Sequence, residues 1–313
     1  MRNLVPYEGN TFDFHKDVIR KKRHAPKDPN FKTRVTSYNN VIKNKFEEFE
    51  NKFINDRLED LAPVGYTGQE KDTLHKLYKY KSKILKDLKN SLTKTVHDRK
   101  SSRCQNCTIS EVNSFDHFLP KNEFAEFSVN PINLFPSCTI CNSYKGAIWR
   151  ENNKRVFLNL YIDILPKKQY LFIDTNINGD DINLTYKLSN IDYNRVQKVL
   201  KQLKWSSNTL NFTLKDYDKQ FYTIYSTNFK LFNLINNHYH KLHLCTRFKE
   251  NSGDIITELD IEINRYKSEI DIENIKKIIV KQCNDYREIF GFNYWESILK
   301  LSLINDPNYI NRF

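Results

Sequence analysis

Two Cys-x-x-Cys pairs constrain this 313-residue chain more than any other feature of its sequence. Each pair can present two thiolates to one ion, and four thiolates suit a tetrahedral zinc site with a closed coordination sphere. The separation between the pairs exceeds that of the simplest two-knuckle ribbon, so the segment between them must fold as a unit of its own. We therefore expect a structural Zn²⁺ site formed by Cys104, Cys107, Cys138 and Cys141.

The overall composition predicts a packed chain dominated by helices. Hydrophobic residues make up 39% of the sequence, charged residues 28%, and there are only 7 glycines. Few glycines leave few tight turns, which favours long helices over an all-β sandwich. Because no long apolar run and no apolar leader are present, we expect no membrane span, no signal peptide and a cytoplasmic location. In that compartment, paired cysteines bind metal more often than they form disulfides.

The net charge of +12 favours a polyanionic partner, either a nucleic acid or an anionic membrane surface. A lysine-rich composition caused by an AT-rich genome would produce the same excess. Basic residues concentrate in residues 16–35, within an N-terminal stretch (1–35) that shows no regular pattern. This segment is interpreted either as an arm that follows a phosphate backbone or as a solvated basic segment.

Apolar spacing predicts an antiparallel pair of helices, over residues 36–62 and 69–97, with Ser37 as the cap of the first. Strands are predicted over 155–164, 169–177 and 181–189, and later helices over 193–204, 214–240, 253–267, 271–287 and 294–303. We therefore expect a mostly helical α+β chain with a small β-sheet after the metal-binding centre. The expected parts are a helical region with a basic arm (1–99), a metal-binding module (100–150), a small β region (151–190) and a helical C-terminal region (191–313).

Groups suited to hydrolytic chemistry lie inside and beside the metal-binding module. Asp116 offers a hard oxygen ligand suited to Mg²⁺ or Mn²⁺. His117 titrates near neutrality and can take a proton from water. Asn142 offers an amide oxygen. Lys145 lies three residues further on, on the same helical face, where it could meet a phosphate; an ordinary surface lysine is the alternative.

These residues occur in the order C-x2-C, D-H-x-x-P, N-L-x-P-x-C-x2-C-N-x2-K. This order resembles the HNH endonucleases, the zinc-stapled branch of the ββα-metal (His-Me finger) nucleases. The resemblance covers residues 103–147. It implies two short strands carrying Asp116 and His117, a loop with Asn133, and a helix that starts near Cys141.

The resemblance also implies a role for each matching residue. His117 would be the general base that activates water, and Asp116 and Asn142 would hold a catalytic Mg²⁺ or Mn²⁺. Asn133 would be structural, tying the loop and holding the orientation of the histidine. The implied activity is hydrolysis of phosphodiester bonds in DNA, leaving 5′-phosphate and 3′-hydroxyl ends. The alternative is a zinc-stapled nucleic-acid-binding module without catalysis.

The biological setting is a further expectation from the resemblance. Stand-alone HNH proteins with long unrelated flanks resemble effectors of bacterial antiphage defence systems, which often work beside an ATPase. Restriction enzymes and mobile-element nucleases are the other settings. The chain contains no P-loop pattern, so an ATPase would be a separate subunit. A double-strand cut would need a dimer or two successive nicks, which leaves homo-oligomerisation open.

Other conspicuous residues have ordinary interpretations. His238, His240 and His243 are expected to be solvated or core-edge histidines, and the acidic residues within 254–273 a solvated helix face. Cys245 and Cys283 are expected to be buried thiols. Aromatic residues are expected to pack in the core and not to stack on bases; these are Trp149, Trp205, Trp295, Phe115, Phe118, Phe124 and Phe127.

Overall fold

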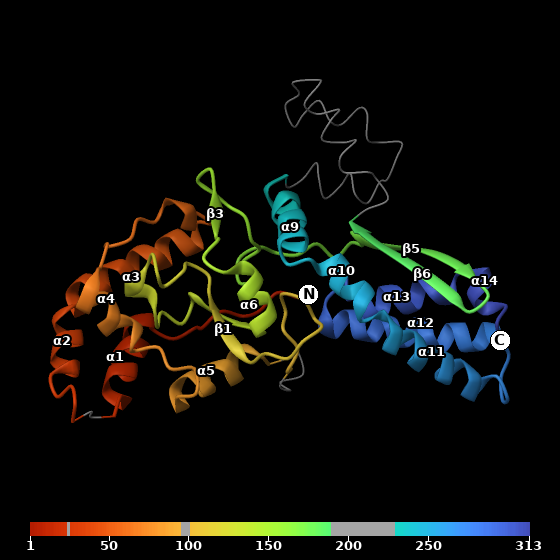
Figure 1. The fold of residues 1–313 in the computed structure, drawn as a ribbon, viewed down its shortest axis with the longest axis horizontal. Coiled ribbons are helices and arrows are strands. Elements are labelled where there is room, and N and C mark those ends of the chain that lie inside the picture. The colour runs from red at the N-terminus through yellow and green to blue at the C-terminus, as the bar shows by residue number, and fades with distance from the viewer. Residues whose placement is uncertain (24–25, 95–100, 189–228) are drawn as a thin grey trace, which may run out of the picture. The chain divides into compact units, whose positions relative to one another are not determined.

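Figure 1 shows the fold of the chain in a computed structural model, which describes residues 1–23, 26–94, 101–188 and 229–313. Its contacts divide the chain into two compact units. The N-terminal unit comprises residues 3–106 and 110–164, and the C-terminal unit comprises 165–313 together with 1–2 and 107–109. The expected α+β class is confirmed, because helices are accompanied by small antiparallel sheets. The four-part division expected from the sequence stays a prediction.

The N-terminal unit combines short helices with two-stranded ladders. Its helices are α1 (Thr11–Lys21), α2 (Phe31–Ser37), α3 (Asn39–Ile54), α4 (Gly68–His75), α5 (Lys83–Leu92) and α6 (Thr139–Lys145), with 3-10 turns at Leu58–Asp60 and Ala125–Phe127. Its strands are β1 (Ser114–His117), β2 (Leu134–Ser137), β3 (Arg150–Glu151) and β4 (Lys154–Arg155). β1 pairs with β2 and β3 pairs with β4, both antiparallel.

An aromatic core joins α3 to the loop between β1 and β2. Phe46 and Phe49 of α3 lie 6.0 and 4.9 Å from Phe127, measured between ring centroids. Phe127 stacks on Phe124, which in turn meets the edge of Trp149. All five side chains are buried, which confirms the expectation for Trp149, Phe124 and Phe127. The loop after His117 is therefore anchored to the helical part of the unit.

The helix predicted over 69–97 is wrong, because the chain forms two helices with a non-helical connection at 76–82. Tyr78 and Tyr80 explain the break. The Tyr78 ring packs against His117 and the Tyr80 ring against Phe115. Side chains two positions apart cannot share one face of a regular helix, and residues 76–82 form turns in its place. The connection therefore leaves the helical path so that both tyrosines reach β1.

The first predicted helix, over 36–62, is confirmed only over its central part. α3 ends at Ile54, and α2 precedes it. Ser37 does not cap a helix: it is the last residue of α2, and its hydroxyl donates to the carbonyl oxygen of Arg34 at 2.7 Å.

Helix α1 was missed, because residues 1–35 were predicted to be irregular. The Asn10 side chain accepts a hydrogen bond from the backbone N–H of Asp13 at 2.8 Å and so caps the helix. Phe14 and Val18, one turn apart, are buried. This apolar face was present in the sequence, but the basic residues interspersed with it concealed the helical period.

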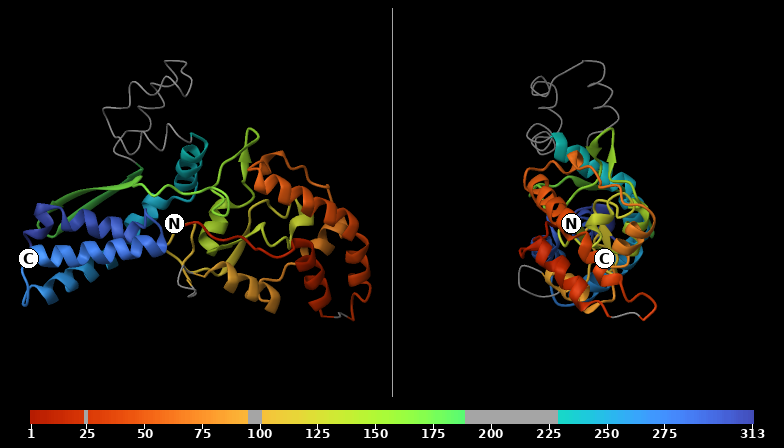
Figure 2. Two further views of the ribbon diagram at one scale, coloured as in Figure 1. Left: turned by 180° about the vertical axis from the view of Figure 1, so that it is seen from behind. Right: turned by 90° about the vertical axis from the view of Figure 1, so that its left-hand side faces the viewer.

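The C-terminal unit places a β-hairpin on a layer of helices. The hairpin is β5 (Leu171–Asn178) and β6 (Asp181–Leu188), and the helices are α9 (Phe229–Lys241), α10 (Leu244–Glu250), α11 (Ser252–Tyr266), α12 (Ile272–Phe290), α13 (Trp295–Ile304) and α14 (Pro307–Ile310). β5 packs on α13 and β6 on α10 (Figure 2). Gly179, with φ of +58°, makes the turn between the strands.

Most predictions for this unit are confirmed. The strands at 169–177 and 181–189 correspond to β5 and β6, and the last three predicted helices correspond to α11, α12 and α13. The helix over 193–204, Trp205 and most of the helix over 214–240 lie outside the described residues. Trp295 is buried, as expected.

The strand predicted over 155–164 is wrong, because only Lys154–Arg155 pairs in a ladder. The Arg155 guanidinium donates to both carboxylate oxygens of Asp163, at 2.9 Å each. The same carboxylate accepts from the backbone N–H of Asn159 at 2.7 Å. These bonds fold the segment back on itself, so its apolar residues are buried by a compact turn and not by a sheet.

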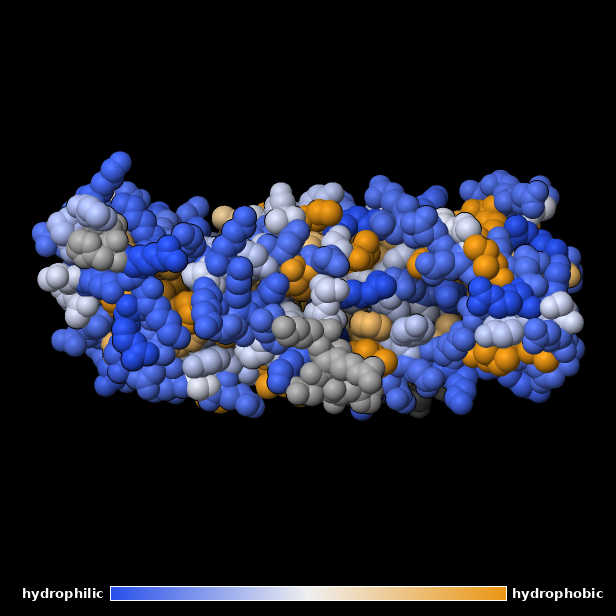
Figure 3. Space-filling model, turned by 90° about the horizontal axis from the view of Figure 1, so that it is seen from below, coloured by the Kyte–Doolittle hydropathy of each residue, from blue (hydrophilic) through white to orange (hydrophobic). Residues whose placement is uncertain are grey.

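Within the described ranges, every helix is too short or too polar to cross a lipid bilayer. On the face shown in Figure 3, hydrophobic residues form separate groups among hydrophilic ones.

Burial of His15 in α1 predicts loss of stability in acid. Its ring stacks on Phe12 and meets the edge of Phe46, and burial lowers its pKa to about 4, although Asn39 opposes the shift. The unfolded chain has a His pKa near 6.5, so this contribution is complete above that value and is lost as the pH falls from 6.5 to 4. We expect a loss of up to about 3 kcal/mol.

The measurement is the free energy of urea unfolding between pH 7 and pH 4 for wild type and for His15→Phe. The variant, which keeps an aromatic ring, should show a shallower pH dependence. Parallel curves for the two proteins would contradict the assignment.

Candidate functional site

The four cysteines of the two Cys-x-x-Cys pairs converge. Their sulfur atoms all lie within 4.8 Å of one another, and all four residues are buried. A tetrahedral zinc ion with bonds of about 2.3 Å requires sulfurs about 3.8 Å apart, so a small contraction would fit the ion. The backbone N–H of Cys141 donates to Sγ of Cys138 at 3.3 Å, which favours a thiolate. The cluster can therefore bind a structural zinc ion.

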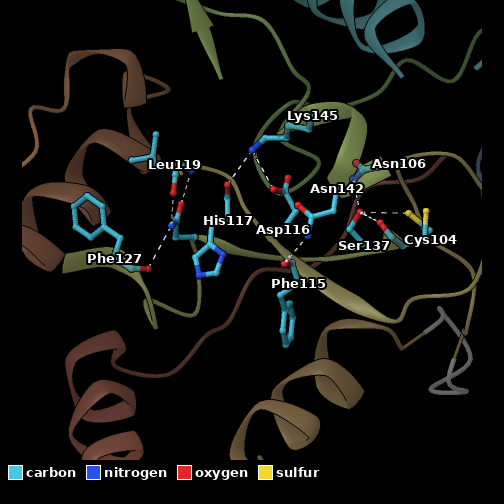
Figure 4. Close-up of polar contacts among 12 residues, drawn as sticks. Cys104, Asn106, Phe115, Asp116, His117, Leu119, Phe127, Ser137, Asn142 and Lys145 are labelled. Carbon is cyan, nitrogen blue, oxygen red and sulfur yellow. Dashed lines mark hydrogen bonds and ion pairs between the residues drawn. The ribbon is translucent and has the colours of Figure 1, made fainter. Parts of the chain in front are cut away.

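Ser137 links the cysteine cluster to the hairpin. It is the last residue of β2, and its hydroxyl lies 3.8 Å from Sγ of Cys104. The same hydroxyl accepts a hydrogen bond from the Asn106 amide at 3.3 Å (Figure 4). The cluster is thus attached to one end of the β1–β2 ladder, where Ser114 faces Ser137.

A helix follows the hairpin directly. Cys138 follows the last residue of β2 and is the N-cap residue of α6, whose first residue is Thr139. α6 packs against β1. The resemblance implied two strands and a helix that starts near Cys141, and the observed order of strand, strand and helix agrees with that expectation. Both Asp116 and His117 lie on β1.

Asn133 closes the other end of the hairpin. Its side chain is fully buried. The amide oxygen accepts from the backbone N–H of Leu119 at 2.8 Å, while the amide nitrogen donates to the carbonyl oxygens of Leu119 at 3.1 Å and Phe127 at 3.4 Å. These bonds pair a side chain with the backbone as a neighbouring strand would. They tie both limbs of the loop together, which is the kind of contact expected of Asn133.

Asp116 is buried against α6 and paired with Lys145. The Lys145 ammonium donates to the Asp116 carboxylate at 3.0 Å and to the carbonyl oxygen of His117 at 2.9 Å (Figure 4). The two side chains are only 6% and 5% exposed, respectively. Burial raises the pKa of Asp116, and the positive charge of Lys145 opposes that rise. Lys145 is therefore not a surface lysine here, and its expected phosphate contact stays a prediction.

Asn142 lies one turn before Lys145 on the same face of α6. Its amide nitrogen donates to the carbonyl oxygen of Phe115 at 3.2 Å. Its side chain lies beside that of Asp116 in Figure 4. A carboxylate oxygen and an amide oxygen are both ligands that Mg²⁺ and Mn²⁺ accept. In the described structure the Asp116 carboxylate is paired with Lys145, so binding of a divalent ion by Asp116 and Asn142 stays a prediction.

His117 is held by the loop that Asn133 closes. Its Nε2 lies 2.9 Å from the carbonyl oxygen of Ser128, the residue after Phe127. A carbonyl can only accept, so Nε2 carries the proton and Nδ1 keeps a free lone pair. Burial lowers the pKa of His117 to about 3, although the bond to Ser128 opposes the shift. The imidazole is therefore neutral at physiological pH.

The two members of the Asp-His pair lie on opposite faces of β1. The Asp116 carboxylate faces α6, whereas the His117 ring points the other way (Figure 4). On that second face, Tyr78 packs edge-on against His117, with ring centroids 4.7 Å apart. Adjacent residues alternate in a strand, so this divergence follows from the regular pairing of β1. The resemblance predicted the two residues but not their separation by the strand.

Tyr78 is the residue near the site that the sequence analysis missed. The Lys121 ammonium lies 5.4 Å from its ring centroid, and Nε2 of His75 lies 2.7 Å from the carbonyl oxygen of Lys121. The sequence Tyr-x-Tyr was the signal that could have revealed the break, because two aromatic residues two positions apart do not fit the three- and four-residue spacing of a helix face.

The remaining candidates behave mostly as expected. Among the described residues, the four cysteines are the only group of three or more His, Cys, Asp or Glu side chains close enough to hold a metal; the histidines near residue 240 and the acidic residues of 254–273 form no such group. His238 is buried, while His240 and His243 are exposed. Cys283 is buried and Cys245 partly so, and burial raises the pKa of both thiols to about 11. Phe115 and Phe118 are buried.

Comparison with known proteins gives one partial likeness. The chain is 34% identical over 130 residues to "Protein ea31" of Escherichia phage lambda. The match covers 38% of this chain and 43% of that protein, so the chain spans less than half the length of this relative. No protein-family description and no solved structure matches the chain.

The cysteine cluster makes a direct prediction about metal content and stability. Purified wild-type protein should contain one zinc per chain by elemental analysis. Cys138→Ser should lose the metal and lower the melting temperature, because a small hairpin with little core of its own depends on the ion. Cys245→Ser, which alters a cysteine outside the cluster, should keep the zinc and the wild-type melting temperature. A metal-free wild type with an unchanged melting temperature would contradict the site.

Proposed function

We propose that this chain is a metal-dependent endonuclease of the HNH type that hydrolyses phosphodiester bonds in nucleic acid, with DNA as the expected substrate. The observation that carries the proposal is the group formed on β1 and α6. There, Asp116, Asn142 and Lys145 meet within hydrogen-bonding reach of the backbone around His117. The cysteine cluster and the Asn133 amide lie at the two ends of the hairpin that supports this group.

His117 is the proposed general base. The bond from Nε2 to Ser128 fixes the tautomer, so Nδ1 is the atom that takes the proton from water. Tyr78 covers the ring in the described conformation, and His117 is 8% exposed. We propose that the 76–82 connection shifts when substrate binds, so that the attacking water and the scissile phosphate can both approach Nδ1. Solvation of the ring would also raise its pKa toward the range in which a histidine is an effective base.

Asp116 and Asn142 are the proposed ligands of Mg²⁺ or Mn²⁺. When bound, such an ion supplies charge stabilisation for the scissile phosphate and the departing 3′-oxygen. Lys145 competes for the same carboxylate, because its ammonium already neutralises Asp116. It must loosen that pair when a divalent ion arrives, and its charge then becomes available to a phosphate. Lys145 would thus pair with Asp116 when the ion is absent and with a substrate phosphate when the ion is bound.

A second candidate is a zinc-stapled nucleic-acid-binding module that does not cleave. The observation that favours it is the placement of His117 beneath Tyr78, on the face of β1 opposite Asp116. Cleavage assays decide between the two candidates.

The setting of the nuclease is also a proposal. An effector of antiphage defence with a separate ATPase subunit is the first option, and a restriction or mobile-element nuclease is the second. The phage source of the partial relative keeps the mobile-element option open. Homo-oligomerisation would supply two cutting centres for a double-strand break.

Cleavage is tested by nicking of supercoiled plasmid with added Mg²⁺ or Mn²⁺. His117→Ala should lower the rate by about 10³-fold, the usual contribution of a general base. Its zinc content should be unchanged. His240→Ala, which alters an exposed histidine of α9, should cut like wild type.

Equal cleavage by His117→Ala and wild type would eliminate His117 as the base. Loss of zinc and of the folded state in His117→Ala would identify a structural histidine. DNA binding without cleavage across several metals would favour the non-cleaving module.

The competition at Asp116 is tested by Lys145→Met, which keeps the side-chain length but removes the charge. Without added divalent ions, the variant should lose about 3 kcal/mol of stability, since it leaves a buried carboxylate unpaired. Mn²⁺ should then raise its melting temperature more than that of wild type, because no ammonium competes for Asp116. The control Asp116→Asn/Lys145→Met should show neither effect. A smaller Mn²⁺ response in Lys145→Met than in wild type would show that Lys145 assists ion binding.

A further inference from the structure

A basic cavity lies in the N-terminal unit, where the end of α1, the start of α2 and the end of α4 come together. Its volume is about 320 Å³. Four basic side chains contribute to its lining, and Asp28 is the one carboxylate among the described lining residues; the basic residues are Lys22, Arg23, Lys32 and Lys76. Four positive charges against one negative charge make the hollow strongly attractive to anions.

Two of these lysines are positioned by backbone carbonyls. The Lys22 ammonium donates to the carbonyl oxygen of Lys76 and lies 5.3 Å from the ring centroid of Phe31. The Lys32 ammonium donates to the carbonyl oxygen of Arg20 at 3.0 Å. A carbonyl orients an ammonium without cancelling its charge. In the part of the chain that the structure describes, no carboxylate forms an ion pair with Lys22, Lys32 or Lys76.

Asp28 does not neutralise the hollow, because it is already paired. Both of its carboxylate oxygens accept from Nη2 of Arg34, at 2.9 and 2.7 Å. The carboxylate of Asp28 therefore has Arg34 as its hydrogen-bond partner, with a smaller electrostatic attraction to Lys76, and one carboxylate does not balance the four basic groups of the lining.

The lysines repel one another across this space. The pKa of Lys22 is lowered, first by burial and then by the charges of Lys79 and Lys76. Like charges gathered around a hollow destabilise a fold unless an anion shares them. The repulsion is consistent with a site that is completed by a ligand.

Helix capping accounts for only part of the arrangement. Lys32 bonds a carbonyl in the last turn of α1, and Lys22 bonds the C-cap residue of α4, as cations near helix C-termini often do. Capping explains neither the ammonium of Lys76 nor the guanidinium of Arg23.

We propose that this cavity binds phosphate groups of a polynucleotide backbone. Arg23 and Lys76 are exposed at the surface, and the exposed residues Lys21 and Lys27 lie close by in sequence. A row of exposed basic residues can contact several phosphates of one backbone, whereas a site for a single buried phosphate would not require residues outside the cavity. Lys76 is also two residues before Tyr78, so a bound backbone would lie beside the connection that covers His117. The proposal does not depend on cleavage, since a module without catalysis would use the same contacts.

The test is binding of a fluorescently labelled 20-base-pair duplex by anisotropy, without added Mg²⁺ or Mn²⁺, at several salt concentrations. Lys22→Met/Lys76→Met should weaken binding about tenfold at 0.1 M salt and reduce the slope of log K against log salt by about 1 for each lost contact. Lys277→Met/Lys281→Met, on α12, removes the same charge from the C-terminal unit and should bind like wild type. Lys22→Arg/Lys76→Arg, which keeps the charge, should restore most of the affinity.

A second arm identifies the source of the phosphate. Inorganic phosphate and ATP are titrated into wild type and into the Met variant by calorimetry at constant ionic strength. Weak or absent binding of both, together with the loss of duplex binding, supports the proposal. Stoichiometric binding of either small anion, with duplex affinity equal in wild type and variant, would overturn it in favour of a small-molecule site. Equal behaviour of all proteins in both arms would overturn the site itself. Melting temperatures establish that each variant is folded.

Discussion

The buried carboxylate of Asp116 is the constraint around which the candidate site is arranged. A carboxylate removed from water is unfavourable unless a cation or several hydrogen-bond donors replace the lost hydration. Lys145 supplies that cation from the last turn of α6, and its ammonium also donates a hydrogen bond to the carbonyl oxygen of His117. The pair therefore fixes how α6 lies on β1. Because Asn142 shares the same helical face, its amide is brought to the strand by the same contact.

Short-range features of this site were predictable from the sequence. The spacing of the cysteines predicted their convergence, and the resemblance of the ordered motif to the HNH endonucleases implied a hairpin followed by a helix. The same resemblance singled out Asn133 and Asn142, because the motif that carries it occupies a short stretch of chain. The hairpin β5–β6 was also predicted, since alternation and a Gly-Asp turn are local signals.

Long-range packing limited the prediction elsewhere. The connection at 76–82 has the composition of a helix, but it forms turns, and Tyr78 and Tyr80 within it contact a strand more than thirty positions away. Residues 156–160 are apolar enough for a strand, but the bonds between Arg155 and Asp163 close them into a turn. In both segments, contacts outside the local apolar pattern set the conformation, and it differs from the one that this pattern predicted. The same limit applies to the basic cavity, whose lysines lie at the ends of three helices that are separate in sequence.

The contacts at both ends of the β1–β2 ladder determine the register in which the two strands pair. The cysteine cluster adjoins Ser137 at one end, and Asn133 fastens Leu119 at the other. In an unfastened two-stranded ribbon, a slip of one position reverses which side chains face each side. Such a slip would turn His117 toward α6 and Asp116 toward Tyr78. The adjacency of the two residues thus makes their roles depend on alignment of the strands, and the two fastenings remove that ambiguity.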